Sequence, residues 1–304
     1  MRAIVTTLPG IDDEVELVDL PDPRPVAGQI RIKMAGAAIN PADLHIIDGP
    51  GRNFVQGNPT RRLGLGLDVA GVVDMLGPDV RDFAIGDRAA ALHFPHAPHA
   101  AAGTAAEYVI VPASDAAPVP DEVNLLDAAT VPLNSLTAGQ LLALLGPARD
   151  RRLLVTGAAG GVGGYAVALA AHAGWTVTGL ARTTDHGFLA RAGATQVLTA
   201  LDQASGFDAV LDTALLNEAA LRPVRDHGTY VGVFPGLEPT AVRGITVTAA
   251  VVAPDGILLR EMLELTAQRI LEPRRAGTLP LDKAIHAYRT FRTGGHRGRW
   301  VLTP

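Results

Sequence analysis

The pattern of hydrophobic and polar positions changes near the middle of the chain. From Met1 to about Asp121, short apolar runs such as Gln29–Met34 and Val69–Leu76 are separated by turns rich in Gly, Pro and Asp. Apolar runs of this length between such turn residues are typical of strands. The first part of the chain is therefore predicted to be mostly β.

After Arg152 the pattern alternates between strands and helices. This alternation indicates βαβ units and a parallel sheet. A further helix is predicted at 256–271, followed by a segment at 281–291 and a closing strand at 299–302. The predicted strands of the sheet are Leu153–Thr156, Thr176–Ala181, Gln196–Leu198, Ala209–Asp212, Thr229–Val233 and Ile245–Ala249.

The helix after the first of these strands carries five apolar residues at helical spacing. This spacing places them on one face, which is predicted to pack on the sheet. The residues are Val162, Ala166, Leu169, Ala170 and Ala173.

A glycine-rich turn joins the first strand of the sheet to this helix. A dinucleotide pyrophosphate needs a tight turn, a backbone without Cβ atoms and N–H groups at a helix N-terminus. A strand before the turn and a helix after it favour dinucleotide binding over a purely structural turn. The residues predicted to contact the pyrophosphate are Ala158, Ala159, Gly160, Gly161, Val162 and Gly163.

The end of the second strand of the sheet indicates which dinucleotide binds. NAD sites usually carry an Asp or Glu there for the ribose 2′-hydroxyl. This chain has Arg182 and Thr183 instead, with Arg182 19 residues after Gly163. A guanidinium binds a 2′-phosphate well, so NADPH is the predicted cofactor. The alternative is that Arg182 is an ordinary solvated loop arginine.

Six short motifs in a fixed order give the chain a family resemblance. It resembles the medium-chain dehydrogenase/reductase superfamily, in particular its zinc-free quinone oxidoreductase branch with the zeta-crystallin-like proteins. The motifs are Asn40-Pro41-Ala42-Asp43, Gly66–Val73, Phe83–Arg88, Leu136-Thr137-Ala138, Ala158–Gly163 and Gly298–Leu302.

The resemblance implies an α/β protein with a GroES-like, mostly β catalytic domain and a Rossmann domain with a doubly wound parallel sheet. Residues 1–121 would form the catalytic domain and 122–271 the NADPH-binding domain. Residues 272–304 would return to complete the catalytic domain. A length of 304 residues also favours two domains.

Zinc enzymes of this superfamily hold their catalytic metal with Cys, His and Cys. The matching positions here are Asn40, Leu67 and Leu133, and the chain has no cysteine. None of these side chains is a thiolate or imidazole ligand, so a reaction without metal is expected.

The resemblance also implies which residues lie near the nicotinamide. Asn40 is the candidate catalytic residue, because its amide could hydrogen-bond a substrate carbonyl. Asn-Pro-Ala-Asp is equally a good helix start, with Asn40 as N-cap. Thr137 is a candidate cofactor contact and Asn134 a weaker one; helix capping is the alternative for both. Asp43 is read as a cap and turn former rather than an acid.

The proton donor is left open by the sequence. The segment after Asn40-Pro41 has no tyrosine, although related reductases often carry tyrosines there. His45 and the loop with His93, His96 and His99 are weaker candidates for contact with substrate. The Phe-Pro and Ala-Pro steps between the three loop histidines argue against a metal site.

Composition and charge limit the partners. The net charge is −5 with dispersed basic residues, which argues against nucleic acid. The N-terminal sequence lacks the pattern of a signal peptide and no apolar run is long enough for a membrane span, so a cytoplasmic protein is expected. A small-molecule substrate is expected, and the resemblance implies a homodimer formed through the apolar edge 246–252.

The predicted function is NADPH-dependent reduction of a quinone or an activated C=C bond by hydride transfer without metal. Reduction of an enoyl thioester is the close alternative. A non-catalytic NADPH-binding redox sensor, or a repurposed biosynthetic protein with the same fold, is the alternative from another class.

Overall fold

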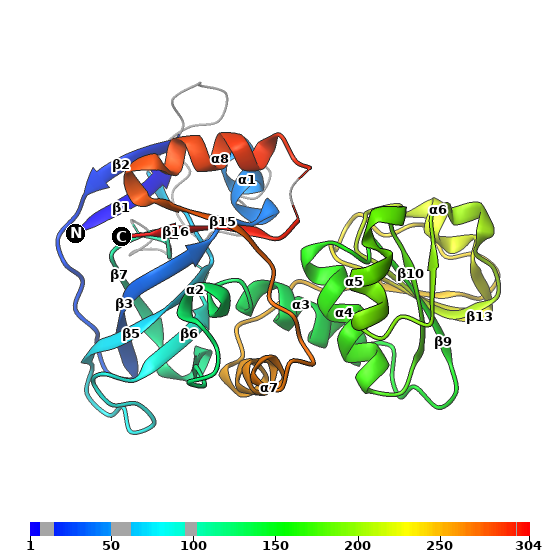
Figure 1. Cartoon of the computed structure of the whole chain (residues 1–304), viewed down its shortest axis with the longest axis horizontal. Helices are drawn as coiled ribbons and strands as arrows, with labels where there is room; N and C mark the ends of the chain where they lie inside the picture. Colours follow the sequence, from blue (N-terminus) through cyan, green and yellow to red (C-terminus); the bar gives the residue numbers. More distant parts are fainter. Residues whose placement is uncertain (7–14, 50–61, 95–101, 296) are drawn as a thin grey trace. The chain divides into compact units, whose positions relative to one another are not determined.

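The computed structural model describes residues 1–6, 15–49, 62–94, 102–295 and 297–304 (Figure 1). They divide into two compact units. One unit comprises 1–133, 254–264 and 273–304, and the other comprises 134–253 and 265–272. Residues 122–133 and 254–264 thus group with the first unit, whereas the sequence assigned them to the second. The C-terminal segment returns to the first unit.

The first unit contains two sheets. The smaller has the order β2-β1-β4, with β1 (Arg2–Thr6), β2 (Val15–Asp19) and β4 (Leu63–Gly64). The larger has the order β15-β16-β3-β5-β6-β8, and β7 also pairs with β3. Its strands are β3 (Gln29–Ala38), β5 (Asp68–Leu76), β6 (Arg88–Leu92), β7 (Tyr108–Pro112), β8 (Ala116–Pro118), β15 (Arg275–Pro280) and β16 (Arg299–Thr303).

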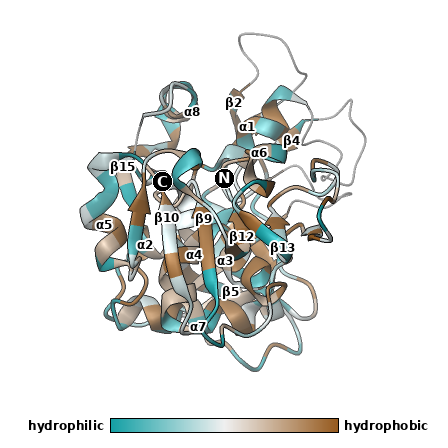
Figure 2. Ribbon diagram, turned by 90° about the vertical axis from the view of Figure 1, so that its right-hand side faces the viewer, coloured by the Kyte–Doolittle hydropathy of each residue, from teal (hydrophilic) through white to brown (hydrophobic). Residues whose placement is uncertain are grey.

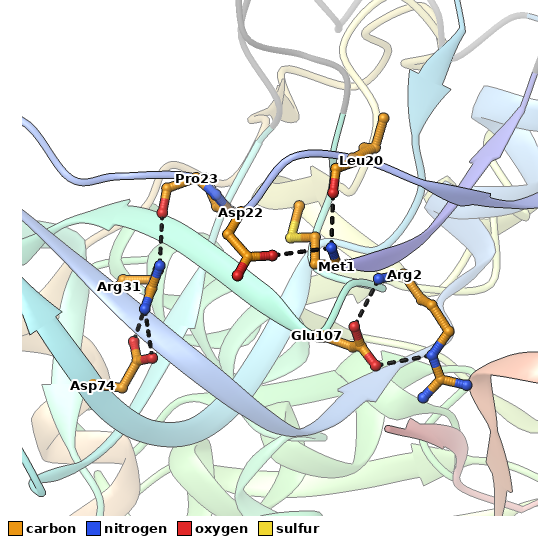
Figure 3. Close-up of polar contacts among 8 residues, drawn as sticks. All are labelled: Met1, Arg2, Leu20, Asp22, Pro23, Arg31, Asp74 and Glu107. Carbon is orange, nitrogen blue, oxygen red and sulfur yellow. Dashed lines mark hydrogen bonds and ion pairs between the residues drawn. The ribbon is translucent and has the colours of Figure 1, made fainter.

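Ion pairs link segments of this unit that are distant in sequence (Figure 3). Arg31 on β3 donates two hydrogen bonds to Asp74 on β5, at 2.9 and 2.8 Å, and a third to the carbonyl of Pro23. Arg2 donates its backbone N–H and its Nε to Glu107. Both pairs are partly buried, and the bidentate Arg31–Asp74 pair fixes β3 relative to its neighbour β5.

The helices of the first unit include α1 (Pro41–Asp48), α2 (Leu125–Ala128) and α8 (Ala284–Arg292). Asn40 precedes α1 with extended backbone and Pro41 is its first residue, as the sequence predicts. Two helices, α3 (Pro132–Ala143) and α7 (Gly256–Ala267), contain residues of both units.

The second unit is built on a six-stranded parallel sheet with the order β11-β10-β9-β12-β13-β14. Figure 2 shows β10, β9 and β12 side by side. The predicted parallel sheet is confirmed, and the strand order reverses between β9 and β12. Its strands are β9 (Arg152–Thr156), β10 (Thr176–Leu180), β11 (Gln196–Leu198), β12 (Phe207–Asp212), β13 (Val224–Gly232) and β14 (Thr246–Ala249).

Helices pack against this sheet: α4 (Gly161–His172) contacts β9 and β10, α5 (His186–Arg191) contacts β11, and α6 (Glu218–Leu221) contacts β12 and β13. The predicted packing of α4 on the sheet is confirmed, but the burial of α4 is not confined to one face. Residues 163–170 are buried on all sides, whereas Ala173 is exposed. The side chains of α4 are mostly small and Phe188 of α5 packs at Gly164, so α4 is covered beyond its sheet-facing side.

In the described part of the chain, no helix combines the length and the apolar character that a membrane span needs.

Candidate active site

The glycine-rich turn lies at the carboxyl end of β9, where the strand order reverses. Gly157 adopts a left-handed backbone with φ +57°, and the N–H of Gly160 donates to the Gly157 carbonyl at 2.8 Å. A Cβ atom on Gly163 would lie 2.2 Å from that same carbonyl oxygen. The turn therefore requires glycine at 163, as close packing of a helix on its strand demands.

The helix α4 begins at Gly161, directly after the turn, with Gly160 as N-cap. The first N–H groups of a helix have no acceptor inside the helix, and the helix dipole attracts negative charge there. Gly161, Val162 and Gly163 supply these N–H groups at the switch point of the sheet. The arrangement fits a dinucleotide pyrophosphate.

Arg182 and Thr183 follow β10, the neighbour of β9. Arg182 has a side chain that is 61% exposed, with its Nε 3.7 Å from a carboxylate oxygen of Asp185, which is 6% exposed. Thr183 opens a short 3-10 helix, Thr183–Asp185. The guanidinium of Arg182 is thus accessible to an anionic ligand. Its ion pair with Asp185 is long and therefore weak.

A buried polar cluster surrounds Asn40 in the first unit. Asn40 is fully buried, and its Nδ2 donates to Asp68 at 2.8 Å and to the Ala38 carbonyl at 3.4 Å. Its backbone N–H donates to Asp43 at 2.7 Å, and Asp43 also accepts the N–H of Gly66 at 3.0 Å. Both N–H groups of the Asn40 amide thus have acceptors within the fold.

Burial shifts the proton affinity of both carboxyls in this cluster. Desolvation raises the pKa of Asp43 and of Asp68 to about 7. The hydrogen bonds that each carboxyl accepts and the charge of Arg299 lower the pKa, but by less. The Asp43 charge further raises the pKa of Asp68. The cluster can therefore hold a proton near neutral pH.

Two protein families match the chain. The alcohol dehydrogenase GroES-like domain matches residues 26–121, and the zinc-binding dehydrogenase family matches residues 185–302. The first match lies within the first unit, whereas the second spans residues of both units. The chain belongs to the medium-chain dehydrogenase/reductase superfamily.

Individual superfamily members extend this similarity over nearly the whole chain. The chloroplast envelope quinone oxidoreductase homolog of Arabidopsis thaliana is 29% identical over 316 residues, which is 95% of this chain and 94% of the relative. The 2-methylene-furan-3-one reductase of Solanum lycopersicum is 29% identical over 294 residues, or 91% of this chain and 72% of the relative. The structure of the quinone oxidoreductase from Coxiella burnetii superposes with a TM-score of 0.85 at 26% identity, over 100% of this chain and 99% of that one.

Membership of this superfamily implies a nicotinamide cofactor and oxidoreductase chemistry, and the glycine turn fits such a cofactor. Zinc fits less well. The superfamily's ligand positions are Asn40, Leu67 and Leu133 here, an amide and two aliphatic side chains, none of which is a ligand that zinc sites use. Among the described residues, no group of three His, Cys, Asp or Glu side chains could hold a metal ion.

The structure brings these three positions together around Asp68. Asn40 donates its amide to one carboxylate oxygen, and the backbone N–H of Leu133 donates to the other at 2.7 Å. Leu67 is the residue before Asp68. The sequence did not single out Asp68, although it lies in the Gly66–Val73 motif, because one strand shows nothing of the donors that two distant segments supply.

The remaining candidates lie in three places. Thr137 and Asn134 are buried on α3, as part of the second unit, and their cofactor roles stay predictions. His45 is exposed on α1, whereas His93 is half-buried and donates its backbone N–H to the Leu67 carbonyl. His96 and His99 lie outside the described residues.

Proposed function

We propose that the protein reduces a quinone or the activated C=C bond of an enone with NADPH, by hydride transfer and without a metal. The observation that carries this proposal is the glycine turn at the switch point together with an accessible arginine beyond β10. The similarity to a quinone oxidoreductase homolog and to a furanone reductase supports the choice of acceptor.

Each group of residues has a separate task in this proposal. The N–H groups of 161–163 bind the pyrophosphate, and Arg182 binds the 2′-phosphate through charge-assisted hydrogen bonds. The bound nicotinamide supplies the hydride, and the acceptor must be held against it with water excluded. The N–H of Leu133 and the amide of Asn40 fix Asp68, which keeps the Asn40 region in one conformation.

Direct contact between Asn40 and a substrate carbonyl stays a prediction with a specific requirement. The substrate carbonyl would have to replace or share the Ala38 carbonyl as acceptor of one amide N–H, since the other N–H is held by Asp68. The bond to Ala38 is 3.4 Å long and therefore the weaker of the two. Asn40 can thus donate to a substrate without breaking the Asp68 contact.

The test is the loss of NADPH absorbance in a stopped-flow instrument over a panel of acceptors. The panel contains a benzoquinone, a simple enone and crotonyl thioester, and calorimetry compares NADPH with NADH. Turnover of the quinone or enone with preference for NADPH is expected. Turnover of crotonyl thioester alone would move the assignment to enoyl-thioester reduction, and tight NADPH binding without any turnover would favour a redox sensor.

A further inference from the structure

Three side chains of the second unit converge at the carboxyl ends of adjacent strands. Thr156 ends β9, Asp212 ends β12, and Tyr230 lies on β13 near its end. Asp212 is the register partner of Thr156 on one side and of Gly232 on the other. Thr156 and Asp212 thus face each other where the strand order reverses, one residue before the glycine turn.

Asp212 is fully buried, and four donors satisfy its carboxylate. One oxygen accepts the Thr156 hydroxyl at 2.5 Å and the N–H of Ala214 at 3.3 Å. The other accepts the Asn217 N–H at 2.8 Å and the Tyr230 hydroxyl at 3.0 Å. A buried carboxylate with four donors fixes the groups that donate to it, because each would lose a partner if it moved.

The groups held in this way border the glycine turn. The Thr156 carbonyl accepts the Thr213 hydroxyl at 2.6 Å, and a Cβ atom on Gly157 would lie 3.0 Å from that hydroxyl and 3.2 Å from Ala214. The loop after β12 therefore packs directly on the first residue of the turn.

The same loop contains two residues other than glycine with left-handed backbone, Leu215 at φ +56° and Asn217 at φ +49°. Such backbone costs free energy and persists where the surroundings enforce it. The bond from the Asn217 N–H to Asp212 is one such constraint.

We propose that Asp212 is a positioning residue for the cofactor site. It binds both Thr156 and the loop 213–217, and so holds the start of the glycine turn in a fixed position against that loop. This inference rests on the proposed function, because it assumes that the turn binds NADPH. Since the contact acts on the turn and not on the acceptor, its loss should weaken cofactor binding and leave the chemical step largely unchanged.

The experiment measures the NADPH dissociation constant by calorimetry and the melting temperature of each variant. In Asp212→Asn an amide NH2 group replaces an acceptor oxygen and faces groups that are themselves hydrogen-bond donors. Thr156→Val removes the hydroxyl while keeping the shape of the side chain. Both should raise the dissociation constant by about tenfold, because NADPH must then order a turn that the free protein no longer holds in place. Thr156→Ser restores the hydroxyl and should bind NADPH within about twofold of the wild type.

The matched control is Asp208→Asn at the amino end of the same strand. Asp208 also accepts several hydrogen bonds, from the Arg152 N–H at 2.8 Å and from the Arg225 Nε at 2.7 Å. It is remote from the glycine turn along β12. Its loss should lower the melting temperature without changing the NADPH dissociation constant.

The outcomes separate the two proposals. A wild type that binds neither NADPH nor NADH overturns the proposed function and this inference together. A wild type that binds NADPH, with Thr156→Val binding equally well, overturns the positioning role alone. If Asp212→Asn does not fold, the comparison of Thr156→Val with Thr156→Ser decides the question.

Discussion

Arg182 is the residue on which the choice of cofactor depends. Its accessible guanidinium is separated from Asp185 by 3.7 Å, so a phosphate would compete with that carboxylate for it. Arg182→Ala should weaken NADPH binding by about 1.5–3 kcal/mol, the value of a hydrogen bond to a charged group. NADH binding should stay unchanged, because NADH has no 2′-phosphate. Calorimetry with both nucleotides measures the difference.

Arg191 provides a control of equal charge. It is an exposed arginine on α5 of the same unit and pairs with Glu272 at 3.4 Å. Arg191→Ala lowers the net charge as Arg182→Ala does, so a general electrostatic effect would weaken NADPH binding in both variants. Equal losses in the two would exclude a specific phosphate contact for Arg182.

The carboxyls of Asp43 and Asp68 make the free energy of unfolding depend on pH. Burial raises the pKa of each from 3.8 to about 7, so the folded state binds more protons than the unfolded state between these values. The free energy of unfolding should therefore fall as pH rises through this window. From about pH 5 to about pH 7 we expect guanidinium unfolding to show a loss of about 2 kcal/mol for each carboxyl that titrates in this way.

Asp68→Asn tests the source of this dependence. The variant removes one of the two carboxyls and is expected to be less stable at low pH, since its amide N–H faces the donors on Asn40 and Leu133. Its stability should change less with pH than that of the wild type over the same window. A wild type that gains stability toward pH 7, or an unchanged slope in the variant, would contradict the assignment.

At the scale of elements, the junction of β9 and α4 depends on the absence of a side chain at Gly163. A Cβ atom there would meet the Gly157 carbonyl oxygen at 2.2 Å and the Ala158 Cα at 2.9 Å, so backbone must move. Gly163→Ala should cost about 1–3 kcal/mol of stability and weaken NADPH binding. Gly164→Ala is the control, because its Cβ would meet only the Phe188 ring within about 3.2 Å, and it should retain NADPH binding. Equal binding losses would contradict this assignment to the turn.

The sequence predicts all six strands of the parallel sheet, although β13 begins at Val224 and not at Thr229, because its first residues are mostly polar. It overestimates the helix at 256–271, which ends at Ala267. Arg269 there adopts left-handed backbone at φ +62°, and the Leu271 N–H folds back to the Leu265 carbonyl. No glycine or proline marks this end, so the pattern of apolar residues alone runs past it.

Those parts of the candidate site that consist of a few consecutive residues can be predicted from the sequence. The glycine turn and Arg182 are each visible in a few consecutive residues. Asp68 and Asp212 escaped notice because their importance comes from donors spread over distant segments, such as Leu133 for Asp68 and Tyr230 for Asp212. A sequence shows an acidic residue at one end of a strand, but the convergence of donors on it is a property of the fold.

At the scale of the whole molecule, β14 is one of the two end strands of the parallel sheet. Among the described strands it pairs only with β13, as expected for an apolar edge at 246–252, and Val251 beside it is 47% exposed. Such an edge can pair with a second copy across a twofold axis, so we propose a homodimer. Light scattering should give twice the chain mass, and Val251→Lys should shift it toward the monomer by placing like charges together. Val26→Lys, at a 63% exposed valine of the other unit, should leave the dimer intact. A monomeric wild type would refute the proposed assembly, whereas a dimer insensitive to Val251→Lys would move the interface elsewhere.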